Sequence, residues 1–151
     1  MIRRFLPGDF SLFAIAIASA AFAQSTLDAT FNNFLSSTFT MGNFERGILE
    51  LPRELPGLLV IFVSALLAFL CPRHLAVTAN ALTGLGMFLI AFFSSSFNTM
   101  LLWLFIGSVG QHLFFPLQSS IAMELAPEGH TGRVLGRLQS WGNMAGLAGS
   151  L

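Results

Sequence analysis

The chain of 151 residues contains no lysine, no tyrosine and only one cysteine. Charged side chains make up 9% of it, whereas an ordinary soluble domain carries about 25%. The single cysteine, Cys71, excludes an internal disulfide and a thiolate metal cluster. Seven arginines balance seven acidic residues, so the chain lacks the excess positive charge that nucleic-acid binding requires. We therefore expect no nucleic-acid partner.

Apolar side chains are abundant instead. Hydrophobic residues make up 54% of the chain, phenylalanine alone occurs 17 times, and the mean hydropathy is +0.75. So many apolar residues exclude a disordered chain, and so few charges cannot keep a soluble surface hydrated. The composition predicts an all-α, polytopic membrane helix bundle with the lipid bilayer as its first partner. The expected location is a bacterial plasma (inner) membrane.

The sequence motifs of common enzymes are missing. There is no GxSxG, HExxH or CxxC motif, and the GLG of residues 84–86 lacks the third glycine of a dinucleotide-binding loop. The three histidines, His74, His112 and His130, lie in different segments. We therefore expect neither an enzyme nor a bound metal or cofactor.

Five apolar segments define the expected helices. Their bounds are 10–35, 50–70, 75–93, 99–123 and 133–151. A membrane helix needs about 20 residues, and the small, apolar residues after Ser140 are too few to complete one. We expect 1–151 to be a partial N-terminal transmembrane domain that ends inside its fifth helix.

The first segment allows two interpretations. Arg3 and Arg4 precede an apolar run that ends in Ala21-Phe22-Ala23, which is typical of a signal peptide cleaved before Gln24. Asp9, however, interrupts the start of that run. An apolar face at helical spacing also continues beyond it, at Leu27, Phe31, Phe34 and Leu35. We favour one long membrane helix and keep the cleaved leader as the alternative.

The second segment contains two prolines. Counted from Pro56 alone, its apolar run is too short to span a bilayer, so we place the start of the helix near Glu50. Pro52 then falls in the first turn, where its missing N–H group costs little, and Pro56 bends the helix. This start draws the nearby charged residues toward the outer leaflet.

Those charged residues form a charge cluster of Arg46, Glu50, Arg53 and Glu54. Arg46 and Glu50 are four residues apart and Glu50 and Arg53 are three apart, so both pairs could meet on a helix. Two interpretations stay open. The charge cluster is either a salt-bridged rim at the outer water boundary or an outer gate that supplies a charge partner for Asp28.

Polar residues recur every four positions on the outer half of the first helix, at Gln24, Asp28 and Asn32. An unpaired carboxylate in hydrocarbon costs at least about 2.5 kcal/mol. We therefore expect Asp28 to face a cavity or a partner, as a proton or substrate site. The alternative is a carboxylate near the helix end, solvated by headgroup water. Gln24 and Asn32 either line the same cavity or make interhelical hydrogen bonds.

The fourth segment carries Gln111 and His112 within an apolar run. Histidine titrates near neutral pH, so His112 is a candidate proton carrier, and a simple hydrogen bond to a neighbour is the alternative. Gln111 is a candidate hydrogen-bond donor on a solute path.

Glycines in the third and fourth segments predict close helix packing. Gly107 and Gly110 remove side-chain bulk from one stretch of the fourth segment. Asn80 and Gly84, four residues apart in the third segment, are expected to pack against a neighbour as well.

The positions of the arginines predict the orientation. With the N-terminus in the cytoplasm, five arginines lie on inner segments: Arg3, Arg4, Arg73, Arg133 and Arg137. Only Arg46 and Arg53 then lie outside. We therefore expect a cytoplasmic N-terminus, with Arg73 and Arg133 in inner loops.

Three stretches resemble the N-terminal half of a major facilitator superfamily transporter. They are the polar outer half of the first helix (24–33), the start of the second (RGILELPRELPG, 46–57) and the link into the fifth (PEGHTGRVLG, 127–136). Gly142, Gly146 and Gly149 are similar to the glycine-rich packing face of that family's fifth helix. The sequence departs at LCPRH (70–74), where the family usually has a loop with glycine, aspartate and arginine, and only Arg73 matches.

The resemblance implies twelve helices in two pseudo-symmetric halves, with a small solute bound between them near the midplane and moved by rocking. The chain would be a fragment of such a secondary transporter, and the missing C-terminal half would be a partner. Asp28 would contact the solute or the coupling ion, with Asn32 and Gln111 lining the path. A hypothesis of a different class is a small membrane scaffold or subunit that acts by helix–helix association, because the last two segments are rich in glycine.

Overall fold

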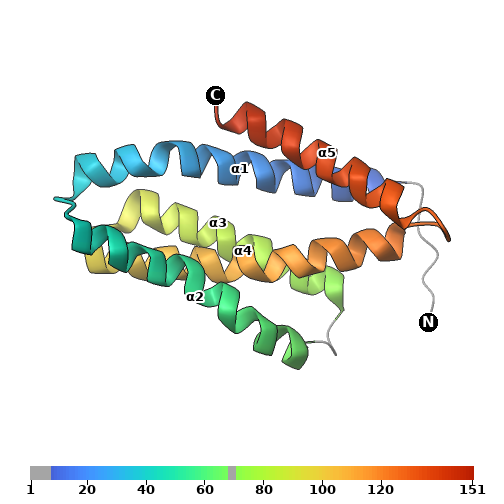
Figure 1. Cartoon of the computed structure of the whole chain (residues 1–151), viewed down its shortest axis with the longest axis horizontal. Coiled ribbons are helices and arrows are strands. Elements are labelled where there is room, and N and C mark those ends of the chain that lie inside the picture. Colours follow the sequence, from blue (N-terminus) through green and yellow to red (C-terminus); the bar gives the residue numbers. More distant parts are fainter. Residues whose placement is uncertain (1–7, 68–70) are drawn as a thin grey trace. The chain divides into compact units, whose positions relative to one another are not determined.

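The computed structural model describes residues 8–67 and 71–151, which form five α-helices and no strand (Figure 1). The helices are α1 (Asp9–Thr38), α2 (Asn43–Leu67), α3 (Pro72–Phe93), α4 (Phe97–Leu125) and α5 (Thr131–Gly149). This confirms the all-helical prediction. The helix of α1 continues through Ala23 and Gln24 without a break.

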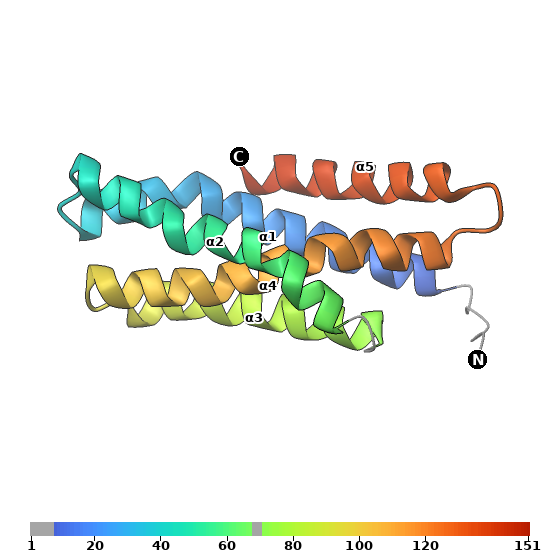
Figure 2. The ribbon, with the colours of Figure 1, turned by 60° about the horizontal axis from the view of Figure 1, so that its bottom comes forward.

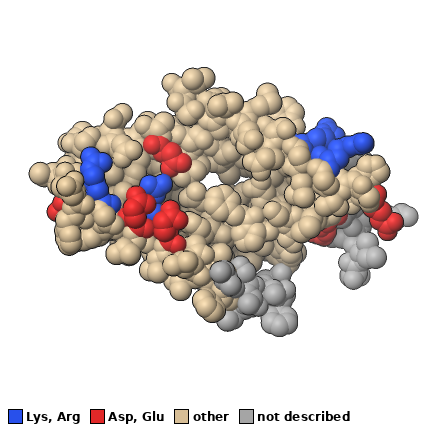
Figure 3. Space-filling model, in the orientation of Figure 1, with Lys and Arg blue, Asp and Glu red and all other residues tan. Residues whose placement is uncertain are grey.

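Three of these helices are long and apolar enough to cross a membrane: α1, α3 and α4. The described parts of α2 and α5 do not combine sufficient length, high hydropathy and few charged residues in the same way. Most of the face seen in Figure 3 is uncharged, in keeping with the composition. The expectation of membrane helices is thus confirmed for three segments by their length and composition.

The chain divides into two compact units. The terminal unit comprises Met1–Asn32 and Gln118–Leu151, and the central unit comprises Asn33–Leu117. Helices α1 and α4 contribute to both, whereas α5 belongs to the terminal unit and α2 and α3 to the central unit (Figure 2). Each unit is held together by its own helix contacts.

In the central unit, α3 and α4 pack closely through glycines. A Cβ atom added at Gly86 would collide with the Cα and N atoms of Gly107, and one added at Gly110 would collide with the backbone of Ala79 and Thr83. These contacts run in opposite directions along the two helices, so the pair is an antiparallel hairpin. The predicted close approach at Gly107 and Gly110 is confirmed.

In the terminal unit, α5 packs against the first part of α1 through Gly142, Gly146 and Gly149. Added Cβ atoms there would lie 3.3 Å from Cγ2 of Ile17 and 3.0 Å from Oγ of Ser25, and would collide with the carbonyl oxygen of Phe22. The contacts advance together along both helices, so the pair is parallel. The hydroxyl of Thr26 also donates a hydrogen bond of 2.9 Å to the carbonyl oxygen of Gly149.

The start of α2 differs from the prediction. The helix begins at Asn43 rather than near residue 50, so Pro52 lies well inside it and not in its first turn. The reason is a cap by Glu45: the backbone N–H group of Gly42 donates 2.9 Å to Oε2 of Glu45, and the N–H group of Arg46 makes a helical bond to the carbonyl oxygen of Gly42. This cap begins the helix two turns before the prolines.

The two arginines assigned to inner loops are also placed differently. Arg73 lies in the first turn of α3 and Arg133 in the first turn of α5. Pro72 is the first residue of α3, a position where its missing N–H group has no helical partner to lose. Both arginines thus lie at the starts of helices, directly after the connecting segments. Arg3, Arg4 and the last three residues of the expected 50–70 helix lie outside the described residues.

Candidate functional site

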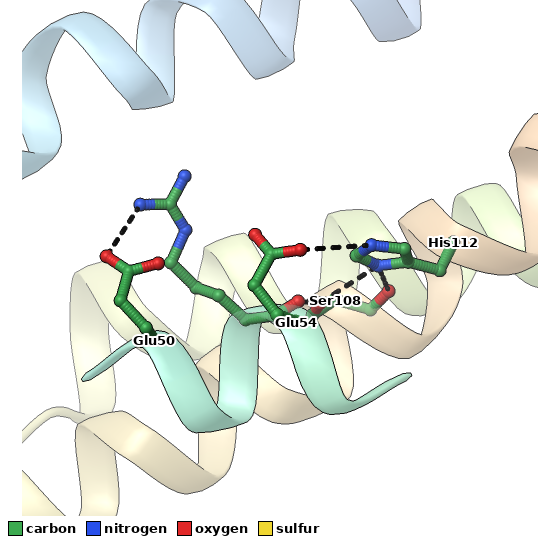
Figure 4. Close-up of polar contacts among 5 residues, drawn as sticks. Glu50, Glu54, Ser108 and His112 are labelled. Atoms are coloured by element: carbon green, nitrogen blue, oxygen red, sulfur yellow. Dashed lines mark hydrogen bonds and ion pairs between the residues drawn. The ribbon is translucent and has the colours of Figure 1, made fainter. Parts of the chain in front are cut away.

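The candidate site lies in the central unit, where the middle of α2 meets the middle of α4 (Figure 4). Helix α2 contributes Arg53, Glu54 and Gly57, and α4 contributes Ser108 and His112. Around them α4 is apolar in sequence, whereas the first half of α2 also carries Glu45, Arg46 and Glu50. The site therefore lies where the charged part of α2 meets an apolar part of α4.

Ser108 joins the two helices at this point. Its hydroxyl, in a residue only 6% exposed, donates a short hydrogen bond to the backbone carbonyl oxygen of Arg53. That carbonyl follows Pro52, whose own carbonyl oxygen loses its helical partner because Pro56 has no N–H group. Serine hydroxyls satisfy backbone groups near proline in membrane helices in this way. The bond fixes the register of α2 against α4.

Ser108 also orients the imidazole of His112. The Nδ1 atom of His112 lies 3.0 Å from the carbonyl oxygen of Ser108 and 3.2 Å from its hydroxyl oxygen. A carbonyl oxygen only accepts hydrogen bonds, so Nδ1 carries a proton and donates it. The other ring nitrogen, Nε2, faces the Oε2 atom of Glu54 at 4.0 Å (Figure 4).

Gly57 provides the space that the imidazole occupies. A Cβ atom at this position would lie 2.7 Å from Cδ2 and 2.8 Å from Nε2 of His112. Any larger residue would press on the ring. Gly57 thus gives the imidazole of His112 the room to lie against α2.

The charges of α2 are divided between two contacts. Arg53 pairs with Glu50 through Nη1 and Oε1 at 3.6 Å, as the three-residue spacing predicts. Glu54, whose side chain is 68% exposed, points to His112, whose side chain is 19% exposed. Arg46 is exposed and makes no ion pair with Glu50 in the described part of the chain. The charge cluster therefore does not act as one network.

The polar stripe of α1 lies in the terminal unit, whereas Gln111 and His112 lie in the central unit. Asp28 and Asn32 are exposed and Gln24 is half-buried. The amide of Gln24 donates a 3.1 Å hydrogen bond to Oδ1 of Asp28. The spacing of four residues thus yields a local pair on α1.

Sequence reasoning identified His112 but missed Ser108 and Gly57. Ser108 is four residues before His112, which places the two on one face of a helix and is the signal that could have paired them. Gly57 follows Pro56 in a helix interior, where glycine is costly and usually has a packing reason. Neither signal names the partner helix.

A cavity of about 280 Å³ lies within the terminal unit between α4 and α5. Its polar lining comes from Gln118, Ser119 and Gln139. None of the residues singled out from the sequence as site candidates lines this cavity. In the described residues, no three His, Cys, Asp or Glu side chains are placed to hold a metal ion.

Replacing Ser108 by alanine should destabilise the central unit. The carbonyl oxygen of Arg53 loses its hydrogen bond from α4 and the imidazole loses one of its contacts, so we expect a cost of about 0.5–1.5 kcal/mol. Thermal unfolding of the detergent-solubilised protein measures it. Ser140→Ala, on an exposed serine that bonds only within its own helix, is the control and should change little. Equal stability of the two variants would contradict the assigned role of Ser108.

No protein-family model, curated protein or solved structure matches the chain.

Proposed function

We propose that the chain is the N-terminal membrane part of a secondary transporter for a small solute. One observation carries this proposal: His112, an ionisable residue, is half-buried and held by Ser108 near the middle of the apolar helix α4. Ionisable groups inside membrane helices are costly and mark substrate, ion or proton pathways. A scaffold that acts only by helix association has no need of such a group.

The architecture of the proposal is that of the major facilitator superfamily. In it α2 and α5 also cross the bilayer, the N-terminus is cytoplasmic, and a second half completes the solute site. The close glycine contacts of α3 with α4 and of α1 with α5 support it, because small residues at helix contacts are typical of membrane bundles. The sequence of residues 24–33, 46–57 and 127–136, which resembles that family, supports it as well.

In this proposal Asp28, Asn32 and Gln111 line the solute path. Asp28 and Asn32 present their side chains on the exposed surface of α1, where a solute or a second half of the transporter can reach them. Gln111 is half-buried beside His112 on α4.

Uptake by proteoliposomes tests the function. The protein, as its gene encodes it in full, is assayed with radiolabelled sugars, amino acids, carboxylates and lipophilic cations. We expect accumulation of one of these classes above empty liposomes. His112→Ala should lower the rate about tenfold or more, which corresponds to about 1.4 kcal/mol on one step of the cycle, because the proposed ionisable group of the pathway is lost.

Two further variants serve as a control and as a test of Asp28. His74→Gln, on an exposed histidine in the first turn of α3, should transport like the parent. Asp28→Asn should transport more slowly, and unchanged transport with unchanged pH dependence would remove Asp28 from the mechanism. A folded protein that accumulates none of the four classes would contradict the transporter and favour the scaffold.

A further inference from the structure

We propose that Glu54 and His112 form a proton-binding site and that the proton is the ion that drives transport. The second part rests on the proposed transport function. The first part rests only on the geometry of the central unit, where Nε2 of His112 faces Oε2 of Glu54 at 4.0 Å.

The orientation of the imidazole decides what this site binds. Because Nδ1 donates to the carbonyl oxygen of Ser108, a neutral His112 presents the lone pair of Nε2 to Glu54. A lone pair and a carboxylate repel each other. A single proton on Nε2 turns the same geometry into a donor facing a charged acceptor, with no rearrangement. The ligand that fits between these two atoms is therefore H⁺.

No other charge competes for this position within the described elements of the central unit. On α2, Arg53 is paired with Glu50, and Glu45 caps the helix start. On α3, which packs against α4, the charged or titratable residues Arg73 and His74 lie in the first turn, whereas the contact at Gly110 is made by Ala79 and Thr83. Residues 97–117 of α4 and 33–42 contain no charged residue, and His112 is their single titratable side chain.

The proton changes how α2 is held against α4. With the proton bound, the two helices share an ion pair in addition to the hydrogen bond from Ser108 to Arg53. Without the proton, the hydrogen bond from Ser108 remains, and the exposed side chain of Glu54 can turn away from His112 into solvent. A ligand shifts a conformational equilibrium by its different affinity for the two states. The proton binds more tightly in the state in which Glu54 faces His112 than in the state in which it does not.

The first test needs no solute. Thermal unfolding of the solubilised protein is followed between about pH 6, where histidine is commonly protonated, and about pH 8, where it is neutral. The attraction exists only when Nε2 carries the proton, so it stabilises at the acidic end and is lost as the pH rises. We expect the melting temperature to fall with rising pH, and to fall less in Glu54→Gln and in His112→Gln. Glu128→Gln, on an exposed loop residue, should keep the parental slope.

The second test uses the solute found by the uptake assay. With the membrane potential clamped, a gradient of about one pH unit, acidic outside, drives about tenfold accumulation of a neutral solute carried with one proton. Glu54→Gln and His112→Gln should equilibrate the solute without accumulating it. Because Glu54 is exposed, its amide variant keeps the fold even where His112→Gln does not.

The outcomes separate the two proposals. Accumulation that ignores the pH gradient would overturn proton coupling and leave the transporter standing. A protein that transports nothing would overturn the transport function, while the unfolding experiment still decides the proton site. A pH slope of stability that is identical in the parent and in both amide variants would overturn the site itself.

Discussion

Gly86→Ala is expected to separate α3 from α4. A Cβ atom at Gly86 would collide with the Cα and N atoms of Gly107 and would lie 3.0 Å from the carbonyl oxygen of Trp103. All three are backbone atoms, so no side chain can rotate away, and the helices must move apart. Inserting one carbon into a close contact typically costs about 1–3 kcal/mol, and the backbone collision places this variant at the upper end.

The separation should be visible as a loss of thermal stability. Gly84→Ala is the matched control, because it lies on the same helix two residues earlier and a Cβ atom there meets nothing within 4 Å. In an open helical position alanine is favoured over glycine by up to about 1 kcal/mol. We expect the two variants to shift the melting temperature of the detergent-solubilised protein in opposite directions. A Gly86→Ala protein as stable as the parent would contradict the helix contact.

Gly84 also shows a limit of sequence reasoning. Both Gly84 and Gly107 were expected to pack, yet Gly84 faces open space and Gly86 makes the contact. Composition identifies a helix that can approach a neighbour closely. It does not say which face does so when glycines lie two residues apart and point in different directions. The expectation for Gly84 is therefore wrong, and that for Gly107 is right.

The helices themselves were predictable, because long apolar runs separated by short polar breaks admit few alternatives. The exception is the start of α2. There, the length needed to span a bilayer placed the start near Glu50, whereas the cap of Gly42 by Glu45 begins the helix earlier. A glutamate that accepts from the backbone N–H group ahead of a helix stabilises the first turn whether or not that turn is apolar.

The site was predictable residue by residue but not as a group. His112 and Glu54 were each singled out, the first as a proton carrier and the second as part of a rim or a partner for Asp28. Their pairing depends on the register of α2 against α4, which the Ser108 hydrogen bond to the Arg53 carbonyl sets. Such a bond to a backbone group leaves no trace in the pattern of side-chain types.

Gly57→Ala is expected to abolish proton-driven accumulation. The new Cβ atom would lie 2.7 Å from Cδ2 of His112 and 2.8 Å from Nε2. The imidazole is the end of a side chain, so it can turn away while the backbones stay in place. In turning, it gives up the 3.0 Å contact with the Ser108 carbonyl and its position facing Glu54. The proton site is lost although both of its ionisable groups are still present.

Two measurements distinguish this result from simple unfolding. Solute accumulation under a gradient of about one pH unit should fall from about tenfold to equilibration, while the melting temperature changes less than in Gly86→Ala. Gly47→Ala is the control, since it lies on the same helix with nothing within 4 Å of an added Cβ atom. It should accumulate solute like the parent. If Gly57→Ala also accumulates solute about tenfold, the orientation of His112 is not what holds the proton, and the coupling must lie with other residues.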